Sequence, residues 1–146
     1  MSVIDVNKLA LKNFLSYGNK RQELELNGLT FITGYNPNND RKNYTGKTSL
    51  LKSIPFSFFG QVGGINKSRL VNWKHRKNLE TEIHFSKNQN DYVIYRGIKP
   101  DYLKVTENGK ELPTPPDKRV FQKEIEQDLL QMTYSAFMNT VYADNN

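Results

Sequence analysis

The stretch FITGYNPNNDRKNYTGKTSLL, residues 31–51, decides the fold that this sequence predicts. Its second half contains Gly46-Lys47-Thr48, the usual ending of a phosphate-binding P-loop. In the pattern G-x-x-x-x-G-K-(S/T) the first glycine would stand where this chain has Arg41, and the nearest earlier glycine is Gly34. The stretch is therefore a chance match, a broken nucleotide site, or a real site with a longer loop.

The residues on both sides of this loop favour a real site. Residues 29–33 form a short apolar stretch that runs into Gly34, as expected of a strand. From residue 48 to residue 59 apolar side chains recur at helical spacing, and Gly60 is a suitable stop signal. Strand, loop, Gly-Lys-Thr and helix is the order that a P-loop requires. We therefore predict a P-loop rather than a chance match.

The N-terminal residues predict strands joined by turns. Leu9 and Leu11 lie between polar residues, and residues 23–26 alternate with period two. Tyr17-Gly18-Asn19 is the turn signal between these two strands. We expect a second turn at Asn27-Gly28, which would separate residues 23–26 from the strand that enters the P-loop.

The middle of the chain predicts hairpins. Residues 80–86 alternate, and a turn over 87–90 leads into a second strand at 92–96. A stronger hairpin signal is Glu107-Asn108-Gly109-Lys110, because Asn-Gly supplies the positive φ angles of a type I′ turn. A strand over 102–106 and a short return strand should flank it.

The last part of the chain predicts helices. Asp117 follows a proline cluster and is expected to cap a helix. Phe121, Ile125 and Leu129 recur every fourth residue, which predicts that they form the buried stripe of that helix. A second short helix is expected to begin at Thr133.

Composition limits the classes of protein. A length of 146 residues is typical of a single domain. The sequence contains no cysteine, which excludes disulfides and cysteine-ligated zinc. Two histidines make a histidine-based metal site improbable. We find no signal peptide and no apolar run near the roughly 20 residues of a membrane span. We therefore expect a cytoplasmic protein without membrane contact.

The positive charge is concentrated in one segment. The formal net charge is +6, and no acidic residue lies between Asp40 and Glu80. Such a run is either a solvated basic face or a surface for polyanions. On the second interpretation the candidate DNA-binding residues are Lys67, Arg69, Lys74, Arg76 and Lys77.

Over its whole length, the chain resembles the N-terminal ATPase lobe of SbcC-like recombination and repair ATPases, which belong to the SMC/ABC type. Within this group it is most similar to the phage-type recombination endonuclease subunits. The resemblance is carried, in the family's order, by LALKNFLSYGNKRQELEL, LTFITGYN, KTSLLKSIPFSFFG, RLVNW, YRGIKPDYLKVTENGKELP and FMNTV. It implies a mixed α/β fold, in which an antiparallel, β-rich meander surrounds the P-loop helix and helices follow at the C-terminal end. Residues 1–146 would then be a single domain, the N-terminal half of an ABC/SMC-type head.

The resemblance also implies a site for ATP and Mg²⁺. Phage-type members carry extra polar residues between the two halves of the loop, so this is a longer site, with Tyr44 in place of one expected glycine. Lys47 would contact the β- and γ-phosphates and Thr48 would bind Mg²⁺, while Asn145 stands where the family has its lid glutamine. The nucleotide-binding residues implied are Gly34, Asn36, Asn43, Gly46, Lys47, Thr48 and Ser49.

Family ATPases carry their Walker B acidic pair and signature motif in a C-terminal half, and this chain contains neither. The resemblance therefore implies no catalytic residue within this chain, and we expect no ATP turnover by the chain alone. The partners implied are the missing C-terminal lobe or an SMC-like chain, an SbcD-like nuclease subunit, and DNA. Exposed strand edges would also favour a homodimer.

Other functions stay open on the sequence. The first is the ATP-binding lobe described above. A second is a non-enzymatic mimic that occupies the surface of the missing lobe and inhibits or regulates an SMC-like or nuclease complex. A third is a basic DNA-binding module that keeps the fold without nucleotide. Binding directed at phosphates should weaken strongly with salt, whereas a protein mimic should keep its partner.

Overall fold

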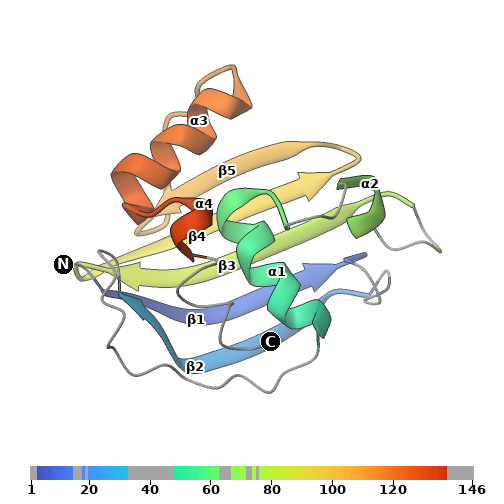
Figure 1. Ribbon diagram of the computed structural model, residues 1–146, viewed down its shortest axis with the longest axis horizontal. Helices are drawn as coiled ribbons and strands as arrows, with labels where there is room; N and C mark the ends of the chain where they lie inside the picture. The colour runs from blue at the N-terminus through green and yellow to red at the C-terminus, as the bar shows by residue number, and fades with distance from the viewer. Residues whose placement is uncertain are drawn as a thin grey trace.

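The computed structural model describes residues 3–14, 18, 20–32, 48–62, 67–71, 74 and 76–137. A six-stranded antiparallel sheet in the order β2-β1-β3-β4-β5-β6 forms one layer, and the helices form another (Figure 1). The elements are β1 (Val3–Lys12), β2 (Gln22–Ile32), α1 (Thr48–Phe59), α2 (Lys67–Leu70), β3 (Leu79–Lys87), β4 (Asn90–Ile98), β5 (Tyr102–Glu107), β6 (Lys110–Glu111), α3 (Lys118–Glu124), the π-helix η1 (Ile125–Leu130) and α4 (Tyr134–Phe137). The sheet and its helices match the mixed α/β fold expected from the sequence.

The predicted turn at Asn27-Gly28 is wrong. Strand β2 is continuous from Gln22 to Ile32 and pairs with β1 along its length. Its register shifts between Val6 and Lys8 of β1, so residues 26–28 of β2 lie opposite the single residue Asn7. The Asn27-Gly28 pair therefore lies within a bulge of β2 instead of forming a turn. Glycine tolerates the irregular backbone that a bulge requires.

The same irregularity explains the apolar pattern of β1. Ile4 and Val6 are buried before the shift, and Leu9 and Leu11 are buried after it. Because Asn7 is an extra residue relative to β3, the alternation between the faces restarts one residue late.

Both predicted hairpins are present. Lys87 pairs with Asn90 across a turn whose central residues, Asn88 and Gln89, have φ angles of 52° and 68°. Asn108 and Gly109, with φ angles of 51° and 85°, form the turn between β5 and β6. Positive φ at both central positions is the type I′ geometry, which matches the twist of antiparallel strands.

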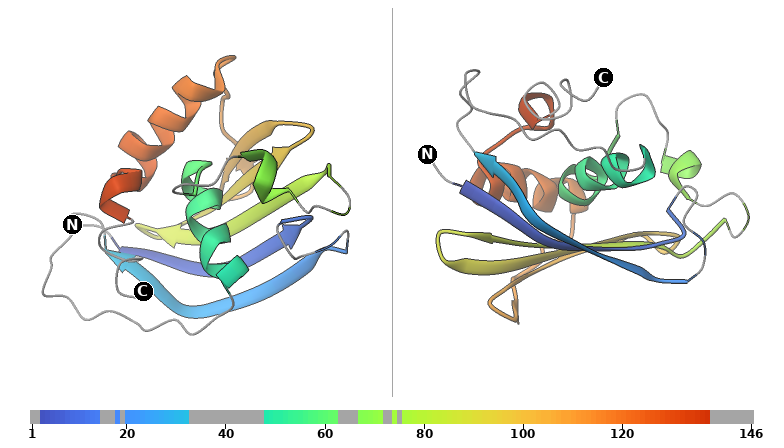
Figure 2. Two further views of the ribbon diagram at one scale, coloured as in Figure 1. Left: turned by 45° about the vertical axis from the view of Figure 1, so that its right-hand side comes forward. Right: turned by 90° about the horizontal axis from the view of Figure 1, so that it is seen from below.

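The helices α1, α3 and α4 lie on one face of the sheet (Figure 2). The larger core cluster joins Phe58 and Phe59 of α1 to the inward side chains of β1, β3, β4 and β5 and to residues of α3, η1 and α4. A second cluster at one end of the sheet joins Phe56 of α1 to Leu70 and Val71. These two clusters fix α1 against the sheet.

The C-terminal helices confirm the predicted starts but correct one buried position. Asp117 caps α3 by accepting a hydrogen bond from Arg119 N, and Thr133 Oγ1 accepts one from Ala136 N at the start of α4. The predicted stripe of α3 fails at Leu129, which is only partly buried, while Leu130 is fully buried. The wider turn of η1 moves the inward position on by one residue.

None of the helices in the described part of the chain is long and apolar enough to span a membrane.

Candidate nucleotide-binding site

Helix α1 begins at Thr48, directly after Gly46-Lys47. Thr48 and Ser49 are thus its first two residues, as the P-loop interpretation requires, although only their backbone is described. The other predicted ligands of nucleotide and metal lie outside the described residues, namely Gly34, Asn36, Asn43, Gly46, Lys47 and Asn145. The structure therefore describes the helical half of the predicted site.

The N-terminal turn of α1 suits an anion. The first N–H groups of a helix have no partner within the helix and carry the positive end of its dipole. No acidic residue stands in this turn, so nothing there repels a phosphate. Lys52, which is partly exposed, adds positive charge one turn further on. These features fit a phosphate group at Thr48, as the motif predicts.

Pro55 does not end α1. The helix continues through it to Phe59 and stops at Gly60, whose φ of 76° and N–H bond to Phe56 O at 2.7 Å make a left-handed C-terminal cap. Because Phe56, Phe58 and Phe59 are all buried, the second half of the helix is held by packing even where proline removes a backbone donor.

A buried arginine holds the C-terminal end of α1. Arg96 of β4 donates from Nε to Ser57 O at 3.3 Å and from Nη2 to Phe58 O at 3.2 Å. The same Nη2 donates to Gln122 Oε1 of α3 at 2.6 Å. Carbonyls at a helix C-terminus carry partial negative charge, so a guanidinium is a suitable partner. Arg96 therefore ties the P-loop helix to β4 and α3.

This role of Arg96 is not among the predictions from the sequence, although a signal for it is present there. In β4 the side chains of Tyr92, Ile94 and Ile98 point into the core, and Arg96 is in phase with them. An arginine at an inward position of an alternating strand indicates a buried partner, because an unpaired buried charge is costly.

The predicted DNA-binding residues lie on α2 and between α2 and β3. Arg69, Lys74, Arg76 and Lys77 are exposed, and Lys67 is the first residue of α2. Their segment is anchored by Leu70 and Val71, which are buried, and by a bridge from Val71 to Phe14. The structure thus brings exposed cations together on an anchored segment.

On the open face of the sheet, several cations are paired with acids. Arg21 contacts Glu23 at 3.0 Å and Glu82 at 2.9 Å, and Lys8 lies 3.6 Å from Glu23. A hydrogen bond with His84, helped by the charge of Arg21, holds the pKa of Glu82 below its usual value. Such a mixed surface offers little net attraction to a polyanion.

Among the described residues, no group of three or more histidine, aspartate or glutamate side chains could hold a metal ion. The metal ligands that the resemblance implies are Thr48 and Asn145, the latter in place of a lid glutamine that senses Mg²⁺ and the γ-phosphate.

Comparison with known proteins places the chain in a family. Residues 8–140 match the family described as AAA domain. The chain is 31% identical over 144 residues to exonuclease subunit 2 of Enterobacteria phage T4, and 28% identical over 144 residues to that of Escherichia phage RB69. Each match covers 97% of this chain but 24% of the relative, so the chain spans about a quarter of their length.

Solved structures agree on the fold. One similar structure comes from a study of the structural biochemistry of ATP-driven dimerization and DNA-stimulated activation of SMC ATPases. The chain superposes on it with a TM-score of 0.52 at 21% sequence identity, and the match covers 88% of this chain and 81% of that one. The recombination mediator protein RecF, in its ATPrS form, gives the same TM-score and identity over 84% of this chain and 29% of that one. The chain therefore belongs to the AAA domain family, and its relatives and fold agree with an SbcC-like ATPase lobe.

Proposed function

We propose that this chain binds Mg-ATP as the N-terminal lobe of a DNA recombination and repair ATPase and regulates a partner nuclease once a C-terminal lobe completes it. The observation that carries the proposal is the start of α1 at Thr48, directly after Gly46-Lys47. Lys47 neutralises the β- and γ-phosphates, and the N–H groups at the start of α1 cradle them. Thr48 offers its hydroxyl to Mg²⁺, which supplies charge neutralisation when bound.

The outer edge of β2, which no described strand covers, supports completion by another lobe. Within the described strands β2 pairs only with β1, so the other edge of its 11 residues carries no described strand. A long unpaired edge readily accepts another strand. The phage exonuclease subunits extend well beyond the length matched here, which agrees with a further lobe pairing at this edge.

Calorimetric titration with Mg-ATP tests the nucleotide site. The wild-type chain should bind, Lys47→Ala should lose at least tenfold in affinity, and Lys20→Ala, an exposed lysine before β2, should bind like wild type. No release of phosphate is expected, because the chain has no candidate to position the attacking water. Equal binding by wild type and Lys47→Ala would contradict the assignment, and turnover that depends on Lys47 would contradict the need for a second lobe.

The second part of the proposal is that DNA contacts the basic segment, which is defined here as residues 67–77. Its support is the exposure of Arg69 and Lys77, which stand on either side of the anchored stretch. Removing one cation that contacts a phosphate should reduce the slope of log K against log salt by about 0.9. The double variant Arg69→Glu/Lys77→Glu should therefore lower this slope by about 2 in a fluorescence anisotropy titration with duplex DNA.

The matched control for that experiment is Lys20→Glu/Lys110→Glu, which changes the net charge equally at exposed sites of other segments. If both double variants weaken binding alike, the effect is one of net charge, and the basic segment is not the contact surface. If only the first weakens binding, the segment contacts phosphates.

A further inference from the structure

A buried cation at the C-terminal end of α1 has only neutral hydrogen-bond partners. Arg96 is 8% exposed, and its acceptors are Ser57 O, Phe58 O and Gln122 Oε1. Its guanidinium carbon lies 6.0 Å from the centre of the Phe56 ring. No described carboxylate forms a salt bridge with it. A buried charge is normally compensated by an opposite charge, and among the described residues Arg96 has no such partner.

The acid that comes closest to compensating Arg96 is Glu126 of η1. Its Oε2 atom is already engaged, accepting a hydrogen bond from Gln122 Nε2 at 2.9 Å. Burial lowers the pKa of Arg96 to about 9, and the charge of Glu126 only partly opposes this. Among the described residues, the charge of Arg96 is therefore only partly compensated.

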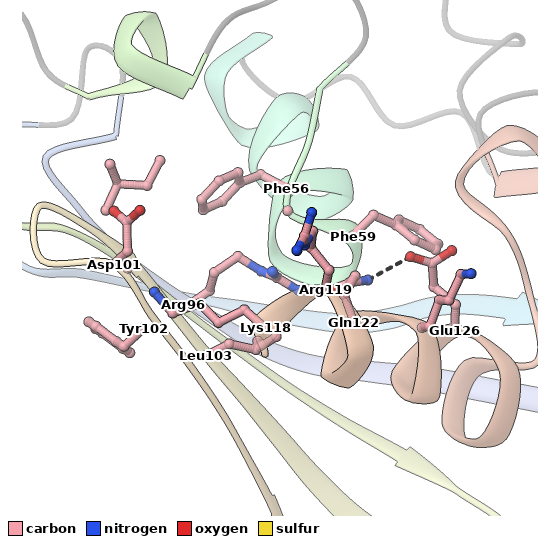
Figure 3. Close-up of a pocket in the computed structure, with 14 residues that line it drawn as sticks. Phe56, Phe59, Arg96, Asp101, Tyr102, Leu103, Lys118, Arg119, Gln122 and Glu126 are labelled. Atoms are coloured by element: carbon pink, nitrogen blue, oxygen red, sulfur yellow. Dashed lines mark hydrogen bonds between the residues drawn. The ribbon is translucent and has the colours of Figure 1, made fainter. Parts of the chain in front are cut away.

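A pocket of about 370 Å³ lies between the end of α1, β4, the start of β5 and α3 (Figure 3). Apolar and aromatic side chains line it, among them Phe56, Phe59, Ile98 and Leu103. Arg96 is also part of its lining, and its Nη1 donates no hydrogen bond to a described residue.

Gly60 makes the approach to this guanidinium possible. A Cβ atom at Gly60 would come within 2.6 Å of Arg96 Nη1, closer than real contacts allow, and the φ of 76° disfavours a side chain as well. The glycine thus serves both the helix cap and the space around Nη1.

The entrance to the pocket is positively charged. Lys118, Arg119 and Lys123 of α3 line it and are exposed. Arg119 is paired with Asp117 at 3.2 Å. Two acids, Asp101 and Glu126, also line the pocket, so the remaining cations, Lys118, Lys123 and Arg96, outnumber them by one. An anion is therefore attracted, but the nearby acids and the apolar walls disfavour a strongly hydrated dianion such as phosphate.

We propose that this pocket is a binding site for a carboxylate carried on an aromatic or apolar body, with Arg96 Nη1 and the α3 cations contacting the carboxylate and the phenylalanine-lined wall contacting the body. The site is separate from the nucleotide site, since α1 has 12 residues and so is about 18 Å long. It stands at the end of α1 opposite Thr48 and does not depend on nucleotide binding. An occupant would contact the P-loop helix and α3 together.

The test is a titration of the ¹⁵N-labelled chain, followed by NMR, with N-acetylphenylalanine carboxylate as the probe. Its neutral amide, which has the same body, and inorganic phosphate, which has none, are the two comparison ligands. For a probe of this size we expect a Kd on the order of 1 mM, with shifts at the amides of Gly60 and Gly97 and at Arg96 Nε–H. The amide and phosphate should each bind at least tenfold more weakly.

Two variants separate binding from folding. Arg96→Met removes the guanidinium but also three hydrogen bonds, so its fold has to be checked first. Lys118→Glu/Lys123→Glu changes only exposed side chains and should weaken the carboxylate probe by about tenfold through charge alone. The equal charge change Lys20→Glu/Lys110→Glu should leave it unaltered.

Three results would overturn the proposal. One is binding of the neutral amide as tightly as the carboxylate. Another is a set of shifts that lies away from the amides around Arg96. The third is equal affinity in the two double variants, which would show that the α3 cations take no part.

Discussion

Replacing Phe58 by alanine should loosen the P-loop helix from the sheet, because this side chain is the centre of its packing. Phe58 is fully buried, and its ring centroid lies 5.5 Å from that of Phe85 in β3 and 6.1 Å from those of Phe59 and Phe137. Truncating a buried phenylalanine costs about 3–5 kcal/mol, which is a large part of the roughly 5–15 kcal/mol by which domains are stable.

Urea unfolding followed by far-UV circular dichroism measures this loss. With a slope of about 2 kcal/mol per molar urea, a loss of about 4 kcal/mol lowers the midpoint by about 2 M. Phe58→Leu keeps most of the volume and should lower it by about 0.6 M. The control Val120→Ala, at a side chain that is 49% exposed, should change stability by less than about 0.5 kcal/mol.

A double-mutant cycle with Phe85→Leu isolates the ring contact, for which we expect a coupling free energy of about 0.5–1.5 kcal/mol. If Phe58→Ala unfolds at the same urea concentration as Val120→Ala, α1 does not pack on β3 through this ring. The position of Thr48 at the start of the same helix would then lose its structural basis.

The two remaining predictions concern the hairpins. Gly97→Ala should lower the free energy of unfolding by about 1–3 kcal/mol, because the added Cβ would lie 2.1 Å from the Tyr102 ring on the paired strand. In Gly109→Ala the added Cβ meets no atom within 4 Å, so the loss of about 1 kcal/mol comes only from the φ of 85°. Equal midpoints in thermal unfolding would show that the Tyr102 ring does not cover Gly97. Burial, with a hydrogen bond to Glu107, raises the pKa of Tyr92 to about 12, so the neutral phenol stabilises the fold below pH 10 and this contribution is lost as the pH rises through 12. Tyr92→Phe should therefore show a shallower loss of stability between pH 10 and 12 than wild type, and an unchanged slope would contradict the assignment.

Local signals in the sequence correctly predicted turns, helix ends and caps, because the conformation of such a short segment depends mainly on its own residues. Asn108-Gly109 forms the predicted type I′ turn, Gly60 ends the helix that starts at Thr48, and Asp117 caps α3. In each case the residue has a backbone preference, or a side chain that reaches its own backbone, so no distant contact is required.

Asn27-Gly28 shows where such signals mislead. The pair has the same local preference as Asn108-Gly109, yet it lies within the continuous strand β2. Strand β2 pairs with β1 on both sides of the irregularity, and this pairing outweighs the tendency of the pair to turn. Leu129 was misplaced for a related reason, since the wider turn of η1 is invisible in a spacing rule based on the α-helix.

The sequence by itself determined the helix that begins at Thr48 directly after Gly46-Lys47, the hairpins and the basic segment, because residue type and spacing along the chain encode each of these. Only the tertiary structure decided that β1 lies between β2 and β3, and that Arg96 reaches both the end of α1 and Gln122 of α3. Those arrangements join residues far apart in sequence, and they follow from how the sheet and helices share one buried core rather than from any local preference.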